Sequence, residues 1–429
     1  MTNDRPQPGY KQTEVGVIPE DWKCESLAGK ILITHGFGFQ SQYFSSQGSY
    51  HLTTPGNFYE EGGFRELGEK QKYYEGSFPD GYLLRPGDLI VAMTEQADGL
   101  LGSAAIIPET GKYLHNQRLG KVTLISSGIE LGFLYYIFNS RKFRAKVQET
   151  AAGTKVNHTS PNKLLEIAIP YPSPGEQRSI AKALSDVDAL IAALDKAIAK
   201  NRHLKTATMQ QLLTGKKRLP GFGEGKGYKE SSIGIIPEDW EVKAVGEVCD
   251  FIVPGRNKPR TFKGDIPWIT TPDLEDGRSI SKSKIGLFVS RDEAKNVGSR
   301  IVPPGSVLMS CVGELGIVAL VEREIVINQQ LHAFIPSKSI DSIFLLNALQ
   351  AQKEYMLSIA TITAVPYLNK DNCNSIPIPL PKFLEQRAIA TVLSDMDTEI
   401  AALETRIAKT QALKQGMMQA LLTGRIRLA

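Results

Sequence analysis

The feature that most constrains this chain is an internal repeat. Residues 176–219 and 385–428 align without gaps at an offset of 209, and 26 of the 44 positions are identical. A shorter pair, residues 10–22 and 228–240, shares 8 of 13 positions and ends in Ile-Pro-Glu-Asp-Trp in both copies. Because a long repeat determines the architecture before any local element does, we expect a tandem duplication in which a short motif, a variable domain and a long helix occur twice.

Both long repeats carry a heptad pattern. Their apolar residues are spaced alternately by four and three positions, which is typical of a helix that pairs with another helix. The sequence Ser173-Pro174-Gly175-Glu176 predicts a helix start, and Leu-Thr-Gly predicts the end of each helix. The next apolar residues, Leu204 and Leu413, fall out of phase, so we expect the seam to change face or supercoil there. The alternative is two ordinary core helices. The predicted helix seam consists of Ile180, Leu184, Val187, Ile191, Leu194, Ile198, Ile389, Leu393, Met396, Ile400, Leu403 and Ile407.

The segments between the repeats predict a mixed α/β class. Short β-rich runs alternate with turns that contain glycine and proline, and two longer apolar segments indicate helices; the runs are 88–94, 121–125, 301–311 and 317–321, and the helical segments are 131–151 and 343–359. We therefore expect two globular domains separated by two long antiparallel coiled-coil helices, with an internal pseudo-twofold axis. The boundaries are 1–172 for the first domain, 173–215 for its helix, 216–240 for a linker and motif, 241–381 for the second domain and 382–429 for its helix.

Composition excludes several functional classes. The formal net charge of this 429-residue chain is +4, which permits a nucleic-acid partner without requiring one. No apolar run approaches the ~18–20 residues of a membrane span, and the start is too polar for a signal peptide. Four dispersed cysteines offer neither zinc-ligand spacing nor a disulfide framework. We expect a cytoplasmic protein without a metal site.

Catalytic motifs are absent from the sequence. It contains no phosphate-binding Gly-x-x-x-x-Gly-Lys-Ser/Thr loop. It also has no Asn/Asp-Pro-Pro-aromatic motif, which a DNA adenine methyltransferase needs to hold a flipped base. The paired carboxylates Asp186/Asp188 and Asp395/Asp397 lie on the predicted helices, where solvated charges or partner contacts are the simplest interpretation. The chain is therefore expected to bind rather than to catalyse.

The repeated helices, the two Ile-Pro-Glu-Asp-Trp segments and the variable domains between them resemble the specificity subunit of a Type I restriction–modification complex over essentially the whole chain. The resemblance implies two target-recognition domains that each read one half of a bipartite site in double-stranded DNA. It implies that the helices set the spacing and dock two methyltransferase subunits, which the endonuclease/translocase subunits join. It also implies that S-adenosylmethionine, ATP and Mg²⁺ belong to those partners, and that this chain has no cofactor and is not an enzyme.

Residue chemistry selects candidate DNA contacts within the domains. Base reading favours Arg, Lys, Asn and Gln on exposed loops. Segment 254–264 of the second domain has four basic residues in eleven, whereas segment 35–43 of the first has glutamines and aromatics. Different chemistry at equivalent places is what two different half-sites require. The candidates are Gln40, Gln42, Tyr43, Thr53, Thr54, Gln117, Arg118, Lys155, Asn157, Arg256, Asn257, Lys258, Arg260, Thr270, Thr271, Gln329, Gln330, Tyr367, Asn369 and Lys370.

Three other interpretations remain open at the sequence level. Each candidate segment is also consistent with a structural turn or a solvated loop, since bases exceed acids by only one over 23–170 and equal them over 241–379. The twin domains are also consistent with a non-catalytic scaffold that grips proteins instead of DNA. An enzyme with an unrecognised site is a third possibility, which predicts turnover by the purified chain alone.

Overall fold

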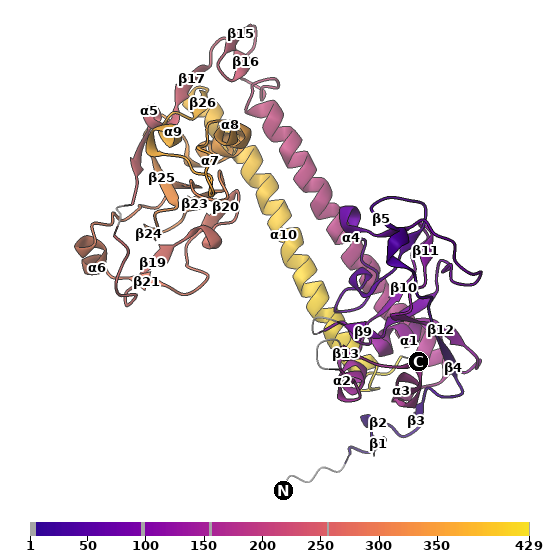
Figure 1. Ribbon diagram of the computed structural model, residues 1–429. Helices are drawn as coiled ribbons and strands as arrows, with labels where there is room; N and C mark the ends of the chain where they lie inside the picture. Colours follow the sequence, from indigo (N-terminus) through magenta and orange to yellow (C-terminus); the bar gives the residue numbers. More distant parts are fainter. Residues whose placement is uncertain (1–5, 96–98, 154–156, 255–256, 429) are drawn as a thin grey trace. The chain divides into compact units, whose positions relative to one another are not determined.

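The computed structural model describes residues 6–95, 99–153, 157–254 and 257–428. These residues form two compact units, one of Met1–Leu194 with Arg406–Ala429 and the other of Asp195–Thr405. Each unit contains one variable domain and one half of each long helix (Figure 1). The unit boundaries therefore fall inside the helices and not at the ends of the predicted segments.

The two long helices are α4 (Pro174–Leu212) and α10 (Phe383–Leu421), with 39 residues each. At 1.5 Å per residue, each is about 58 Å long. The hydroxyl of Ser173 accepts a hydrogen bond from the backbone N of Glu176 (3.3 Å), as the predicted helix start requires. Gly215 and Gly424 follow the helices with φ of +67° and +69°. A Cβ at Gly215 would lie 2.4 Å from Cγ of Pro237, so both the backbone conformation and the packing require glycine there.

The halves of the two helices pair antiparallel inside each unit. In the first unit, Lys414 of α10 forms an ion pair with Asp188 of α4 (2.6 Å). In the second, Lys205 of α4 forms an ion pair with Asp397 of α10 (2.7 Å). The two ion pairs occupy identical places in the 209-residue repeat. Antiparallel pairing is thus confirmed, and all of the predicted seam residues are buried or half-buried.

The expected change of face after the first part of the seam is wrong. Leu204 and Leu413 are 53% and 58% exposed and take no part in the seam. The seam position seven residues after Ile198 is filled by Lys205 in α4, and the position seven residues after Ile407 is filled by Lys414 in α10. Both lysines turn inward to their aspartates. The seam keeps its face and accommodates a lysine, which an apolar pattern cannot show.

The alternative of core helices is correct for part of each helix. Ile180 and Leu184 belong to the hydrophobic core of the first domain, together with Met418 and Leu421 from α10. In the second unit, Ile389 and Leu393 belong to the corresponding core. The start of each helix therefore packs on its own domain as well as on the other helix.

The first domain contains two four-stranded sheets. One is antiparallel, in the order β10 (Ala104–Ile106), β8 (Leu89–Ala92), β12 (Leu119–Leu124) and β4 (Ile31–His35). The other has the order β11 (Tyr113–Leu114), β6 (His51–Leu52), β7 (Tyr73–Tyr74) and β5 (Phe44–Ser45). The domain also contains two strand pairs and three α-helices: β3 (Lys23–Ser26) with β14 (Ala168–Tyr171), β9 (Thr94–Glu95) with β13 (Asn157–His158), α1 (Leu131–Phe138), α2 (Arg141–Glu149) and α3 (Pro161–Glu166).

The second domain repeats this plan with different strand lengths. Its larger sheet has the order β18 (Cys249–Ile252), β25 (Leu331–Pro336), β22 (Val307–Ser310), β23 (Val318–Val321) and β20 (Arg278–Ile280). Its smaller sheet has the order β21 (Phe288–Val289), β19 (Ile266–Ile269) and β24 (Val326–Ile327). Its remaining elements are β17 (Glu241–Ala244) paired with β26 (Pro377–Leu380), α5 (Val245–Val248), α6 (Arg291–Asn296), α7 (Ser342–Ala351), α8 (Lys353–Ser358) and α9 (Lys370–Asn374).

The mixed α/β prediction is confirmed, but each predicted domain helix is divided in two. In the first domain, Asn139 interrupts the helix because its side chain exchanges two hydrogen bonds with the backbone of Ala104 (2.9 and 3.1 Å). Ser140 then caps α2. In the second domain the division falls at Gln352. Segment 301–311 forms a strand only from Val307, after the turn at Pro303-Pro304.

The repeated short motifs form the hairpins β1 (Tyr10–Thr13)/β2 (Gly16–Pro19) and β15 (Tyr228–Ser231)/β16 (Gly234–Pro237). In the first unit, the indole Nε1 of Trp22 donates to Glu176 (2.9 Å). Arg427 bridges that carboxylate to Asp21 (2.8 Å) and lowers the pKa of Asp21 by donating to it. The motif that opens the repeat is thereby fastened to the start of α4 and the end of α10.

The second unit contains the same clasp. The indole of Trp240 donates to Glu385 (3.1 Å), and Arg218 pairs with both Glu385 and Asp239. Because Trp240 is completely buried and Trp22 is 1% exposed, both tryptophans of the repeated motif anchor the packing of their units.

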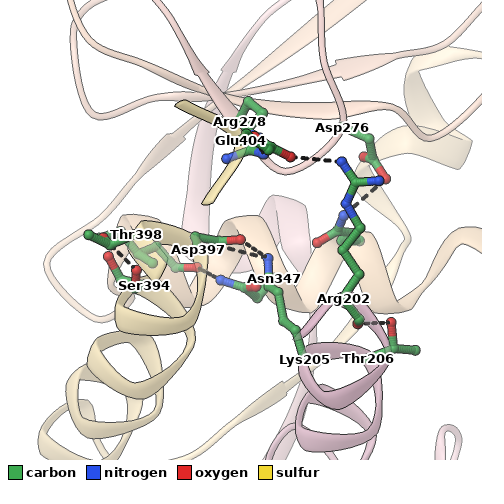
Figure 2. A network of polar contacts seen from close by, with 12 residues as sticks. Arg202, Lys205, Thr206, Asp276, Arg278, Asn347, Ser394, Asp397, Thr398 and Glu404 are labelled. Carbon is green, nitrogen blue, oxygen red and sulfur yellow. Dashed lines mark hydrogen bonds and ion pairs between the residues drawn. The ribbon is translucent and has the colours of Figure 1, made fainter. Parts of the chain in front are cut away.

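An ionic network ties the second domain to both helices (Figure 2). Glu404 of α10 accepts hydrogen bonds from Arg202 of α4 (2.7 Å) and from Arg278 of β20 (2.6 Å). One carboxylate thus holds together three elements that are far apart in the sequence, and it fixes the domain on its half of the helix pair.

Candidate nucleic-acid interface

A backbone ladder joins two predicted contact segments of the first domain. The backbone N of Met93 donates to the carbonyl O of Arg118 (3.0 Å), and the backbone N of Thr159 donates to the carbonyl O of Met93 (3.0 Å). The 116–118 turn and the segment that begins at Asn157 therefore lie on either side of residue 93, although they are about forty positions apart in the sequence.

The second domain has the equivalent ladder. The backbone N of Cys311 donates to the carbonyl O of Gln330 (2.8 Å), and the backbone N of Leu368 donates to the carbonyl O of Cys311 (2.9 Å). The ladder gathers the 328–330 turn and the 367–370 segment. It also establishes that Gln330 is the structural counterpart of Arg118.

Both turns are held by an asparagine that the predicted contacts do not include. Oδ1 of Asn116 accepts from the backbone N of Arg118 (3.0 Å), and Oδ1 of Asn328 accepts from the backbone N of Gln330 (3.2 Å). Such a side-chain turn fixes the backbone two residues on. The signal for these residues was the Asn-Gln pair that recurs in both halves of the sequence.

The glutamine-rich loop of the first domain packs directly on its turn. The backbone N of Gln117 donates to the carbonyl O of Phe37 (3.0 Å). A Cβ at Gly36 would lie 2.3 Å from the carbonyl O of Asn116, so only glycine permits this approach. Phe39 anchors the loop in a small aromatic core. The candidates Gln40, Gln42 and Tyr43 follow on the exposed side and so lie on the same loop as the residues that contact the turn.

The basic segment of the second domain also adjoins its turn. A hollow of about 300 Å³ is lined by residues that include Asn257, Lys258, Gln329 and Gln330. Nζ of Lys258 lies 5.5 Å from the centre of the Trp268 ring, which forms another part of the wall. Arg260 is exposed just beyond the hollow. The ammonium group of Lys258 and the side-chain amides of Asn257, Gln329 and Gln330 therefore line the same hollow.

The paired threonines require a correction. Thr54 and Thr270 are the equivalent residues, because each is the N-cap of a short 3₁₀ turn. Thr53 is completely buried, so its side chain cannot contact DNA. Thr271 is partly exposed, and its hydroxyl donates to Oε1 of Gln330 (3.3 Å). The threonine positions are therefore offset by one between the two copies.

The remaining candidates divide into three groups. Asn157 donates to the buried carboxylate of Glu95 (3.2 Å), and Asn369 caps α9 by accepting from the backbone N of Asn372 (2.8 Å). These two amides therefore have structural partners. Tyr367 and Lys370 are exposed. Lys155 and Arg256 lie outside the residues that the structure describes.

Two buried histidines lie near these turns. His115 directly precedes the Asn116 turn, and His332 follows the Gln330 turn by two residues. They are 2% and 1% exposed, respectively. Burial lowers the pKa of each to about 4. Both imidazoles are therefore neutral at physiological pH.

The described residues contain no group of three or more His, Cys, Asp or Glu side chains that could hold a metal ion. The four cysteines are unpaired. Among the described helices, none combines the length and the apolar character that crossing a bilayer demands.

Comparison with known proteins identifies related sequences. The model of the Type I restriction modification DNA specificity domain matches residues 19–201 and 237–413. A protein described as the MjaX type I restriction enzyme specificity subunit of Methanocaldococcus jannaschii is 28% identical, with 98% of this chain and 97% of that protein covered. The EcoBI specificity subunit of Escherichia coli is 23% identical, with 96% and 86% covered.

The fold also has a counterpart among solved structures. The S subunit of a Type I restriction–modification system from M. genitalium superimposes with a TM-score of 0.57 at 16% identity. The match covers 97% of this chain and 99% of that one. The architecture is therefore shared over the whole chain.

Proposed function

The chain belongs to the Type I restriction–modification DNA specificity family, and we propose that each of its two domains reads one half of a bipartite DNA target. The observation that carries this proposal is the pair of equivalent turns. The same backbone ladder presents Arg118 in one domain and Gln330 in the other. Identical supports that carry different side chains are suited to reading two different half-sites, because sequence is read by side-chain contacts to base edges.

The helices are proposed to set the distance between the half-sites. Half-sites on duplex DNA are separated by a protein ruler in steps of about 34–36 Å per helical turn. The antiparallel halves are locked by Lys205–Asp397 in one unit and Lys414–Asp188 in the other. A change in the length of α4 and α10 would then change the spacer, while each half-site stayed the same.

Two modification subunits are proposed to dock on surfaces that recur in both halves. Exposed apolar residues occupy matching places in the two hairpins, where Val17 is 41% and Ile235 is 62% exposed. Matching exposed leucines occur on the helices at Leu204 and Leu413. Two copies of one partner need two similar surfaces, and an apolar side chain exposed at the same place in each repeat fits that need.

Chemistry is proposed to reside on the partners. The chain acts as the recognition component, S-adenosylmethionine binds the methyltransferase subunits, and ATP and Mg²⁺ bind the endonuclease/translocase subunits. The assembly works in the cytoplasm, where the host DNA is accessible. The purified chain alone is expected to show no turnover with DNA and either S-adenosylmethionine or Mg²⁺.

Genome-wide mapping of N6-methyladenine tests the function. The map is made in the host with the gene intact, with the gene deleted and with the deletion complemented. We expect one split motif to disappear on deletion and to return on complementation. If no motif changes while the methyltransferase partner is expressed, target recognition is wrong, and the protein-interaction scaffold becomes the function to test by pull-down.

A further inference from the structure

The amide of Gln330 is oriented by its neighbours. The backbone N of Gln330 donates to one side-chain atom of Asn328, which must therefore be its oxygen, Oδ1 (3.2 Å). The other end of that amide, Nδ2 of Asn328, is then a donor, and it lies 3.1 Å from the side-chain amide of Gln330. The atom that receives this bond must be Oε1. The orientation of the Gln330 amide thus follows from the backbone.

A second donor completes the arrangement. The hydroxyl of Thr271 also donates to Oε1 of Gln330 (3.3 Å). A carbonyl oxygen has two lone pairs, and both are now engaged. Nε2 of Gln330 makes no hydrogen bond to another described residue, and the side chain is exposed. Among the described residues, the Gln330 side-chain amide therefore presents a hydrogen-bond donor to the outside, while its own acceptor, Oε1, is occupied.

This restriction changes what the glutamine can read. A glutamine with both ends free recognises adenine, since it donates to N7 and accepts from the N6 amino group. With Oε1 occupied, Gln330 can only donate. Guanine presents two adjacent acceptors, O6 and N7, which can engage both N–H groups of the amide. Thymine presents one acceptor, O4, beside its methyl group, adenine presents one acceptor beside a donor, and cytosine presents a donor.

We propose that Gln330, held by Asn328 and Thr271, reads a guanine in the half-site of the second domain. This inference rests on the proposed DNA recognition and adds the identity of one base. Its counterpart Arg118 occupies the equivalent turn and is also a donor-only side chain with a preference for guanine. Asn328 and Thr271 act as positioning residues, because they determine which face of the Gln330 amide is available.

The test uses the full chain with its methyltransferase partner and a plasmid library with a randomised half-site. Wild-type complex is expected to methylate only sites with guanine at one position of that half-site. Gln330→Glu replaces the donor by an acceptor and should lower methylation of guanine sites by at least about tenfold. Gln330→Arg keeps donors and should retain guanine. Thr271→Val frees one lone pair of Oε1 and should admit adenine at the same position only.

The controls distinguish failure of the guanine inference from failure of the proposed DNA recognition. Sites in which only the half-site of the first domain is randomised must keep their preference in all three variants, which shows that the complexes are assembled. If the wild-type complex methylates no split motif, the proposed function itself is wrong. A split motif that Gln330→Glu leaves unchanged, a base other than guanine at the affected position, or loss of guanine preference in Gln330→Arg would overturn this inference alone.

Discussion

Lys205 of α4 and Asp397 of α10 form an ion pair of 2.7 Å in which the lysine is only 9% exposed. The same two places in the other copy of the repeat hold Lys414 and Asp188 at 2.6 Å. Each lysine sits where a heptad seam would ordinarily place an apolar residue, and its aspartate directly follows a seam residue of the other helix. A buried polar residue in such a seam specifies register and partner at some cost in stability, so the pair explains how two similar helices align in one antiparallel register.

Removal of one member of this pair is expected to destabilise the second unit. Lys205→Met leaves Asp397 without its cation, and the loss should be about 2 kcal/mol, between the values for exposed and fully buried pairs. The double variant Lys205→Met/Asp397→Leu should recover most of that loss, because an apolar pair fits a seam. Urea unfolding measures both. The exposed Lys182–Asp186 pair is the control, and Lys182→Met should cost less than about 0.5 kcal/mol.

The equivalent ion pair of the first unit, Lys414–Asp188, makes a further comparison possible. Asp188 also accepts a hydrogen bond from the hydroxyl of Tyr136 (2.8 Å). Burial raises the pKa of this tyrosine, and the negative charge of Asp188 raises it further. Lys414→Met therefore leaves its aspartate with a partner and should cost less than Lys205→Met. An equal or larger cost for Lys414→Met would contradict this account of the seam.

Glycine after the second long helix is expected to be essential. Gly424 has φ of +69°, and a Cβ there would lie 2.4 Å from Pro19. Gly424→Ala should therefore destabilise the first unit by more than about 1 kcal/mol, since strain and overlap add. Gly416 lies inside α10 with nothing within 4 Å of a built Cβ. Gly416→Ala should instead stabilise by up to about 1 kcal/mol. Thermal unfolding of the two variants in parallel measures both effects.

The free energy of unfolding is expected to fall as the pH is lowered from about 7 to 5. Burial lowers the pKa of His115 and His332 to about 4 in the folded chain, whereas an unfolded histidine titrates near 6.5. The unfolded state therefore binds protons first as the pH falls. Between pH 7.5 and 5, each histidine should remove about 2 kcal/mol of stability. His332→Phe should abolish its share of this pH dependence in urea unfolding.

Much of the fold follows from repetition and periodicity. The duplication, the two long helices, their antiparallel pairing and the mixed α/β domains could all be predicted, because identical segments must solve the same packing problem twice. The inward orientation of the seam lysines could not be predicted from the sequence. A hydrophobic pattern treats Lys205 as surface and Leu204 as core, and the structure reverses both. The ion pair depends on Asp397, which is 192 residues away.

The candidate interface was predictable as a set of segments but not as a set of atoms. Sequence reasoning selected the turns that contain Arg118 and Gln330, and the structure places them on equivalent ladders. It did not select Asn116 or Asn328, whose contacts are local and set the direction of the side chains. The Thr-Thr-Pro letters occur in both copies of the repeat, but the strand register shows that the threonines are shifted by one residue, which the letters alone conceal.

The exposed leucines of the helices should decide how many partners bind. Leu204 is 53% and Leu413 is 58% exposed, at identical places in the repeat. If each contributes to one docking surface, Leu204→Asp and Leu413→Asp should each weaken binding of one methyltransferase subunit, and the double variant should weaken both. Sedimentation of the complex then shows assemblies with two, one and no partner subunits.

Leu190 of α4 provides the control for this prediction. It is 39% exposed, but the matching residue of the other repeat is Glu399, so a duplicated surface cannot depend on it. Leu190→Asp should leave two partners bound, and loss of both partners in either single leucine variant would show that the helices do not carry two independent docking sites.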